Sequence, residues 1–159
     1  MLKPGTLFIY FVLLIIFPSN TIKAQINTYS IQGFDFGTFY QGSNGGTIDI
    51  STEGLRTASG DIILMNTWQP SSQAIFEITA PAGSTISVLR GTDSILTGSN
   101  GGTLTLQLQQ TDLGSPFSTT AVAPARTRIK VAGKLIIGNR TSSPPGKYQG
   151  TVSITFNQE

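Results

Sequence analysis

One segment near the end of the chain decides the fold class: Lys147-Tyr148-Gln149-Gly150-Thr151-Val152-Ser153-Ile154-Thr155-Phe156. Its apolar side chains all occupy even positions, namely Tyr148, Val152, Ile154 and Phe156. Successive side chains of a strand point to opposite faces, so this spacing predicts a strand with one apolar face and one hydroxyl-rich face. A helix would scatter the same residues around its circumference.

The same alternation recurs along most of the chain. Strands are predicted over residues 34–39, 47–51, 61–65, 73–80, 84–90, 104–108 and 126–138. Residues 61–65 are a continuous apolar run, which suits a strand covered on both faces, and residues 26–32 are either a first strand or a mobile arm. Gly133 marks an expected bulge. The pattern predicts an all-β protein, an immunoglobulin-like β-sandwich of about seven to nine mostly antiparallel strands.

One hexapeptide occurs twice, as Gly42-Ser43-Asn44-Gly45-Gly46-Thr47 and as Gly98-Ser99-Asn100-Gly101-Gly102-Thr103. Asn-Gly pairs favour hairpin turns because both residues tolerate positive φ. We therefore expect each copy to form the turn of a hairpin. The alternative is an internal duplication or a pair of binding turns.

The beginning of the chain has the layout of a secretory signal peptide. A basic start is followed by the apolar run of residues 7–17, which Pro18 ends. Cleavage is expected between Ala24 and Gln25, so residues 1–24 are a signal peptide and residues 25–159 a single domain. The run is well short of the roughly 20 residues that a membrane-spanning helix needs. The sequence thus predicts an exported protein of the periplasm, cell surface or medium, with no transmembrane segment after cleavage.

Charge and composition exclude several classes of protein. The pI of about 9.1 owes much to Lys3 and Lys23, and without them eight basic residues face eight acidic ones. A neutral exported domain is not expected to bind nucleic acid. The chain has neither cysteine nor histidine, which excludes histidine-dependent triads, zinc sites built on those residues, and disulfides. No cofactor is expected.

Several segments carry a family pattern: Phe36-Gly37, residues 45–50, residues 131–137 and residues 145–154. Together they resemble DUF4402, a bacterial domain of unknown function found in exported proteins. The glycine-x-tyrosine-x-glycine-threonine part, Gly146 to Thr151, is also distantly similar to the last strand of fimbrial and spore-coat-U-type pilus subunits. This resemblance implies an exported sandwich, and for the pilus relation assembly by strand exchange; it implies no catalytic residue.

Four basic side chains form the sharpest surface feature: Arg126, Arg128, Lys130 and Lys134. All are even-numbered within one predicted strand, so a regular strand places them on one face, although a bulge at Gly133 would turn Lys134 away. They either bind an anionic partner, such as acidic glycan or outer-membrane phosphate, or pair with Asp49 and Glu77 on neighbouring strands. The chain is also charge-segregated, with net −5 over residues 25–112 and net +5 over residues 113–159.

Weaker motifs complete the set. Trp68 and Tyr40 are candidates for a sugar-stacking platform. Asp93-Ser94-Ile95 resembles an O-glycosylation motif of exported bacterial proteins, and Asn139-Arg140-Thr141 fits the N-glycosylation pattern. Asp49 and Glu53 are the acids closest in sequence, but neither has a recognisable catalytic setting.

The resulting hypothesis is a non-enzymatic, exported structural or surface protein, fimbria-like, whose partners are copies of itself or related subunits. Strand exchange would make residues 25–32 necessary for oligomers. The alternative is a binding module that uses the basic strand face for acidic glycan or outer-membrane phosphate. A carboxylate-only hydrolase is the third hypothesis, although no enzyme is expected.

Overall fold

The computed structural model describes residues 26–66, 70–122 and 124–159. These residues form eleven strands and no helix, which confirms the all-β prediction. The expected cleavage site between Ala24 and Gln25 lies outside the described residues, as does Trp68. The strands are β1 (Asn27–Gln32), β2 (Phe39–Ile50), β3 (Arg56–Leu64), β4 (Ala74–Thr79), β5 (Thr85–Arg90), β6 (Ser94–Gly98), β7 (Thr103–Thr111), β8 (Phe117–Ser118), β9 (Thr127–Ile137), β10 (Tyr148–Gln149) and β11 (Ile154–Gln158).

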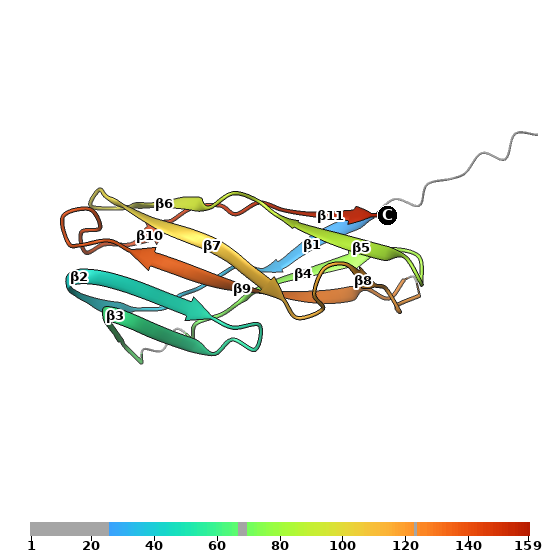
Figure 1. Ribbon diagram of the computed structural model, residues 1–159, viewed down its shortest axis with the longest axis horizontal. Helices are drawn as coiled ribbons and strands as arrows, with labels where there is room; N and C mark the ends of the chain where they lie inside the picture. Colours follow the sequence, from blue (N-terminus) through green and yellow to red (C-terminus); the bar gives the residue numbers. More distant parts are fainter. Residues whose placement is uncertain (1–25, 67–69, 123) are drawn as a thin grey trace, which may run out of the picture.

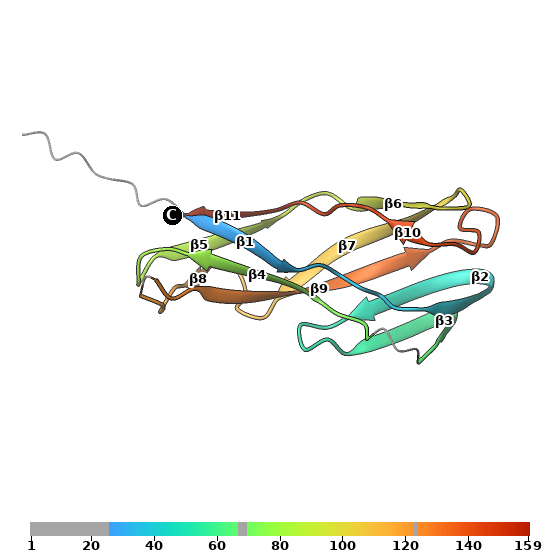
Figure 2. The same ribbon diagram turned by 180° about the vertical axis from the view of Figure 1, so that it is seen from behind.

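The strands run along the long axis of the molecule in two antiparallel sheets (Figures 1 and 2). The larger sheet has eight strands, with the main order β1-β4-β9-β7-β6-β10, and β2 joins β9 to β3. The smaller sheet has the order β11-β5-β8. β9 is a central strand of the larger sheet. Along one edge its first half pairs with β4 and its second half with β2, and along the other edge it pairs with β7.

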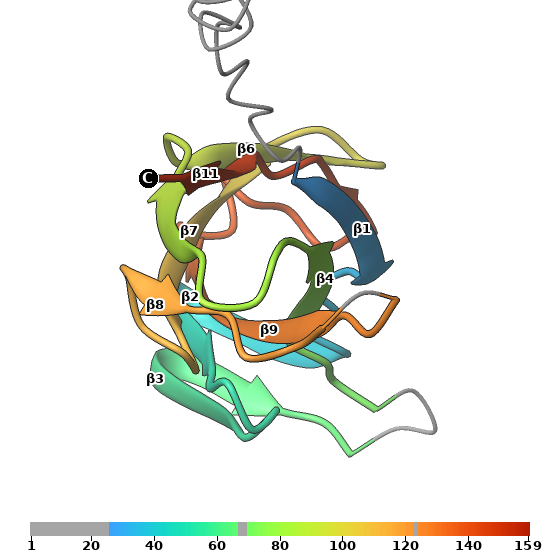
Figure 3. The ribbon, with the colours of Figure 1, turned by 90° about the vertical axis from the view of Figure 1, so that its right-hand side faces the viewer.

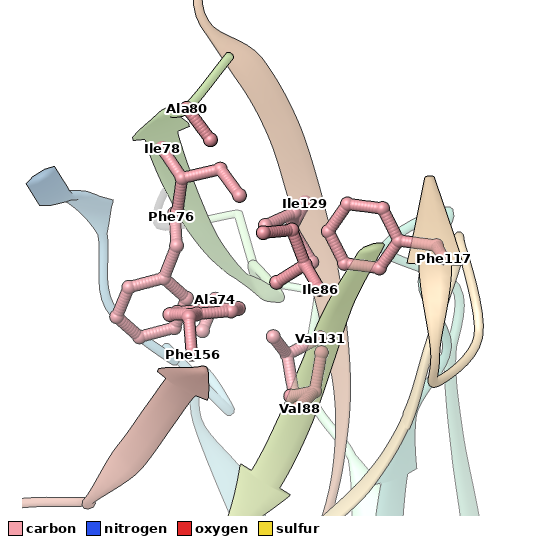
Figure 4. Close-up of a cluster of buried hydrophobic side chains, with 10 residues drawn as sticks. All are labelled: Ala74, Phe76, Ile78, Ala80, Ile86, Val88, Phe117, Ile129, Val131 and Phe156. Atoms are coloured by element: carbon pink, nitrogen blue, oxygen red, sulfur yellow. The ribbon is translucent and has the colours of Figure 1, made fainter. Parts of the chain in front are cut away.

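Two hydrophobic clusters form the core. The first lies between β4 and β9 on one side and β5, β8 and β11 on the other, as the end-on view and the close-up show (Figures 3 and 4). Its members are Ala74, Phe76, Ile78, Ala80, Ile86, Val88, Phe117, Ile129, Val131 and Phe156. The alternation predicted for residues 73–80, 84–90 and 126–138 is confirmed, since the residues expected inward are buried.

The second cluster lies under β2, β6, β7 and β9, and consists of Phe36, Ile48, Ile50, Ile62, Leu96, Leu104, Leu106, Leu135 and Ile137. The strands of the smaller sheet pair with one another and supply no residue to it. Partly buried hydrophobic side chains pack over this cluster, among them Phe34, Phe39, Tyr148 and Val152. This end of the sandwich is therefore closed by two segments of chain rather than by a sheet.

The segment that decided the fold class is split between both sheets. Residues 148–149 pair with β6 in the larger sheet and residues 154–158 pair with β5 in the smaller one. The prediction of a single strand was wrong, although Tyr148, Val152, Ile154 and Phe156 are still the more buried side chains. The split and the two-residue strand β8 raise the number of strands above the seven to nine expected from spacing.

The duplicated hexapeptide folds in two ways. Its second copy forms the hairpin turn between β6 and β7, with Gly101 and Gly102 at φ of 81° and 73°. Its first copy is an irregularity inside β2, where pairing with β3 jumps from Gln41↔Ile62 to Gly46↔Gly60. The prediction of a turn at the first copy was therefore wrong. Both copies need a positive φ at the first glycine of the pair, so local chemistry does not distinguish a turn from a bulge.

Two further expectations about strands are wrong. The run of residues 61–65 was expected to be covered on both faces, but only the face that carries Ile62 packs on the second cluster among the described residues, and Ile63 is 64% exposed. The bulge expected at Gly133 is absent, because β9 keeps its register there and the irregularity lies in β7 between Leu108 and Thr111. Gly133 instead makes room for the Phe34 ring, since a Cβ atom would lie 2.6 Å from Phe34 Cε1.

Replacing Gly133 with alanine is expected to displace the Phe34 ring, which stacks on Phe36 at 5.8 Å between centroids. Overpacking of this kind costs roughly 1–3 kcal/mol, and urea denaturation measures it. Gly33→Ala is the matched control, because a Cβ atom there meets no atom within 4 Å. Equal unfolding midpoints for the two variants would contradict this role of Gly133.

Candidate functional site

A groove of about 1300 Å³ lies over the second cluster. One wall is residues 33–41 and the other is residues 144–150 with Val152. The floor is aliphatic and consists of Leu96, Leu104, Leu106, Leu135 and Ile137. These side chains come from β6, β7 and β9, whose alternation turns every second residue towards the groove. An apolar floor between two stretches of backbone suits an apolar, elongated occupant.

Arg56 holds the first wall in place. Its Nη1 donates to the carbonyl oxygens of Phe36 (2.7 Å) and Thr38 (3.3 Å), and its Nη2 donates to that of Met65 (2.9 Å). The wall needs this support because only an isolated bridge at Asp35 precedes β2 in it. A guanidinium group donates in several directions at once, and a lysine cannot reproduce that geometry.

Arg140 holds the other end of the same wall. Its guanidinium donates to the Gln41 carbonyl oxygen (2.9 Å from Nη2) and to the Tyr40 hydroxyl (2.6 Å), and it lies 5.3 Å from the centre of the Tyr40 ring. Tyr40, half of the predicted sugar platform, is 53% exposed, but its ring is an arginine contact. Sugar stacking stays a prediction, since Trp68 lies outside the described residues.

The family-like motif builds the second wall. The Tyr148 hydroxyl donates to the Pro144 carbonyl oxygen (2.5 Å), and the ring lies on Gly98, where a Cβ atom would come within 2.7 Å of Tyr148 Cε1. Gly150 approaches β6 closely, since a Cβ atom there would lie 2.5 Å from Leu96 Cδ2. Tyrosine and glycine at these positions thus bring the last segment against β6.

The second wall also contains backbone N–H and C=O groups without a backbone partner among the described residues. Within the described residues, no backbone hydrogen bond involves residues 150–152, which lie between β10 and β11. Gly150 and Thr151 are exposed, and Val152 is partly buried over the second cluster. Unpaired N–H and C=O groups beside an apolar floor are the features to which an extended strand adds. The groove can therefore provide both main-chain partners and side-chain pockets for a strand.

The pKa of Tyr148 is raised by burial of its phenol. The unfolded chain then loses this proton more readily than the folded one, so the stability contribution is complete below pH 10.0 and falls as pH rises through the raised pKa. We expect the free energy of unfolding to decline above pH 10.0, and Tyr148→Phe to decline less steeply. Urea denaturation at a series of alkaline pH values measures both slopes, and identical slopes would contradict the prediction.

The predicted basic face is present, and acidic side chains of neighbouring strands form ion pairs with it. Arg126 and Arg128 both form ion pairs with Glu77, at 3.5 and 3.0 Å, and the Arg126 guanidinium also lies 3.8 Å from the centre of the Tyr29 ring. Lys134 lies on the same face, because β9 has no bulge, and it pairs with Asp49 at 3.3 Å. Pairing with Asp49 and Glu77 is thus confirmed.

These ion pairs also answer the question of charge segregation. Each joins an acid of the first part of the chain to a base of the second part, so the two parts interleave in space. Lys130 contributes its backbone N–H to an Asp112 oxygen (2.9 Å). Binding of an anionic glycan by this face stays a prediction, but such a partner would compete with Glu77 and Asp49.

Glu53 is the candidate hydrolytic acid whose pKa is shifted. The pKa of Glu53 is lowered, first by the Thr52 hydroxyl, then by Ser51 and to a small extent by Lys130. A proton donor in hydrolysis needs the opposite shift. In the part of the chain that the structure describes, no three acidic residues gather in a way that would hold a metal ion.

Both glycosylation motifs lie within the described residues. Ser94 lies in β6, where it is partly buried on the same face as Leu96, whereas Ile95 and Thr97 face outward. The Asn139 side chain accepts hydrogen bonds from the backbone N–H groups of Thr141 (3.1 Å) and Ser142 (3.0 Å), which forms its loop. Modification at either residue stays a prediction.

Sequence reasoning missed both arginines of the groove. Arg56 and Arg140 are separated by 20 and 99 residues from the carbonyl groups of Phe36 and Gln41 that they bind. An isolated arginine in a polar stretch gives no sign of which distant backbone it will meet. No motif in the sequence would have identified them.

Comparison with known proteins gives one family. A family model described as "Domain of unknown function (DUF4402)" matches residues 26–157. Neither the curated proteins nor the solved structures gave a match. Among the described residues, no helix is long and apolar enough to cross a membrane.

Proposed function

The chain belongs to the DUF4402 family, whose description assigns no activity, and we propose that it is an exported, non-enzymatic structural subunit. In this proposal the groove accepts an extended strand from another subunit, as in fimbria-like assemblies. The supporting observation is the combination of an aliphatic floor with unpaired backbone at residues 150–152. Export is supported by the signal-like start of the chain.

β1 is the donor strand that we propose. It pairs with β4 alone, five of its six residues are exposed, and its register is interrupted between Ser30 and Gln32. Tyr29 and Ile31 are 37% and 48% exposed, two positions apart, so they share one side of an extended strand. Ile26, just before β1, packs against the first cluster. A strand held by one edge costs less to detach than a strand inside a sheet.

In the groove of a second copy, β1 would be stabilised both by burial of its side chains and by hydrogen bonds of its main chain. Tyr29 and Ile31 would face the leucines of the floor. Burial of the parts that are now exposed, 37% and 48%, would contribute a fraction of the roughly 1.5–3 kcal/mol that full burial gives. The main chain would pair with the free groups of residues 150–152. Because the donor strand and the groove lie at different places on the subunit, repetition of this contact joins subunits head to tail.

A disulfide trap tests this contact, since the chain has no cysteine of its own. The variant Ile31→Cys/Val152→Cys is expected to form covalent multimers under mild oxidation, visible as a ladder on a non-reducing gel. Pairing Ile31→Cys with Leu89→Cys is the control, because Leu89 is exposed and does not line the groove. If the groove pair gives no more multimer than the control at high protein concentration, the proposed contact is wrong.

A further inference from the structure

A row of side chains on the outer face of the larger sheet runs from β1 across β4 to β9, three strands that lie side by side (Figure 2). Tyr29 in β1 pairs with Glu77 in β4, and Glu77 pairs with Arg128 in β9. The three side chains point away from the core, because Phe76 and Ile129, next to them in β4 and β9, are buried on the inner face. Tyr29 is therefore bordered on its own sheet by an acid and then by a base.

Arg126 joins this row from the position just before β9. Its guanidinium carbon lies 3.8 Å from the centre of the Tyr29 ring, within the range of a cation–π contact. The same guanidinium donates from Nη1 to Glu77 Oε2 at 3.5 Å, while Arg128 donates to Glu77 Oε1 from Nε at 3.2 Å and from Nη2 at 3.0 Å. Each carboxylate oxygen of Glu77 thus binds its own arginine. Glu77 therefore holds Arg126 at the Tyr29 ring and offsets the repulsion between two neighbouring guanidinium groups.

Other side-chain attachments of β1 lie at its two ends. Ile26, just before the strand, packs against the first cluster, and the Gln32 side-chain amide donates to the Gln73 carbonyl oxygen at 2.7 Å. Residues 27–31 between them are exposed, and the register with β4 is interrupted after Ser30. The contact of Tyr29 with Arg126 therefore supports the middle of β1.

We propose that Arg126, positioned by Glu77, retains β1 on its own subunit and controls its release as a donor strand. This inference rests on the proposed function, in which β1 leaves β4 for the groove of a second copy. Detachment of β1 separates the Tyr29 ring from the guanidinium, and loss of an exposed cation–π contact changes an equilibrium constant by about two- to fivefold. Salt screens the ion pairs that position Arg126, so β1 is released more readily at high ionic strength.

Hydrogen exchange of the monomer at low protein concentration tests this retention apart from assembly. Arg126→Leu and Glu77→Gln are expected to raise exchange of the β1 amides that pair with β4 by about two- to fivefold, while amides in the second half of β9 keep their rates. Arg128→Leu is the matched control, because it removes the same charge and a partner of Glu77 but leaves the contact of Arg126 with Tyr29 in place. High salt should raise β1 exchange in the original chain and leave it unchanged in Arg126→Leu.

A double variant shows whether the two side chains act together. Tyr29→Leu and Arg126→Leu remove the same contact, so their effects on β1 exchange are expected to be less than additive when combined. The proposal is overturned if the two effects add in full, or if Arg126→Leu changes β1 exchange no more than Arg128→Leu does.

Assembly is measured separately by size-exclusion chromatography. Arg126→Leu keeps both side chains that β1 would bury in the groove, so it is expected to raise the proportion of oligomer by about two- to fivefold. Faster β1 exchange in Arg126→Leu, with monomers for every variant and for the original chain, would support retention of β1 by Arg126 and contradict strand donation. Oligomers whose amount does not depend on Arg126 would support strand donation and contradict its control by Arg126.

Discussion

Replacing Arg56 with methionine is expected to lower the free energy of unfolding by about 1–3 kcal/mol, because three carbonyl oxygens lose a charged donor. The greater effect should be local. Apart from Arg56, residues 33–38 are held by the bridge of Asp35 to Ser72 and by single bonds to Gly33 and Thr38, so without Arg56 this wall is expected to loosen from β3 and the groove to lose its shape. Hydrogen exchange at residues 34–41 should rise well before exchange in β9 does.

Two variants make this result specific. Arg56→Lys keeps the charge but cannot reach three carbonyl groups, so it should show most of the loss. Arg90→Met is the matched control, since Arg90 is exposed and makes no side-chain hydrogen bond or ion pair within the described residues. If Arg56→Met and Arg90→Met give the same exchange profile and the same midpoint, Arg56 does not hold the wall.

Deleting residues 26–32 is expected to abolish assembly while leaving a folded monomer. The two clusters of buried residues contain no member from this segment, and Ile26 is its only residue that packs against them. Size-exclusion chromatography at high concentration should show oligomers for the chain with residues 26–32 and a single monomer peak for the deleted chain. Monomers in both samples would end the assembly proposal.

A milder variant distinguishes the strand from its side chains. Tyr29→Ser/Ile31→Ser keeps the backbone of β1 and removes two partly exposed apolar groups, together with the contact between Tyr29 and Arg126. It is expected to weaken assembly by about 1 kcal/mol for each side chain, since each is only partly exposed before the groove would bury it. The deleted chain should bind an added peptide of residues 26–32 in the groove, with exchange protection at residues 150–152 as the readout that separates the groove from the vacated edge of β4. Failure of the peptide to protect these residues would count against β1 as the occupant.

Much of the fold could be predicted because strand alternation is a local property. Ile86 and Val88, or Ile129 and Val131, are buried where period-two spacing places them. The prediction that failed was cover on both faces: Ile62 and Ile63 look equivalent in sequence, yet they point to opposite faces of β3. Ile62 is buried in the second cluster, whereas Ile63 is 64% exposed. Burial of a strand on its second face depends on a partner that no local pattern names.

The candidate site was predicted only in part. The Gly146 to Thr151 motif pointed to the right segment, and the structure explains its tyrosine and glycines by close approach to β6. The basic face was located correctly, and its pairing with Asp49 and Glu77 is confirmed. The groove itself was not foreseen, since its walls are more than one hundred residues apart in the chain and its support comes from Arg56 and Arg140.

By itself, the sequence determined the all-β class, the inward and outward faces of the main strands, and the need for positive φ at Gly45 and Gly101. These follow from the geometry of one strand or one turn. Only the tertiary structure decided that one hexapeptide is a bulge and its twin a hairpin, and that the last segment serves two sheets. It also decided that residues 33–41 and residues 144–152 form the two walls of one groove. Each of those outcomes depends on which distant strand lies alongside, and pairing between distant strands is set by the packing of the whole chain.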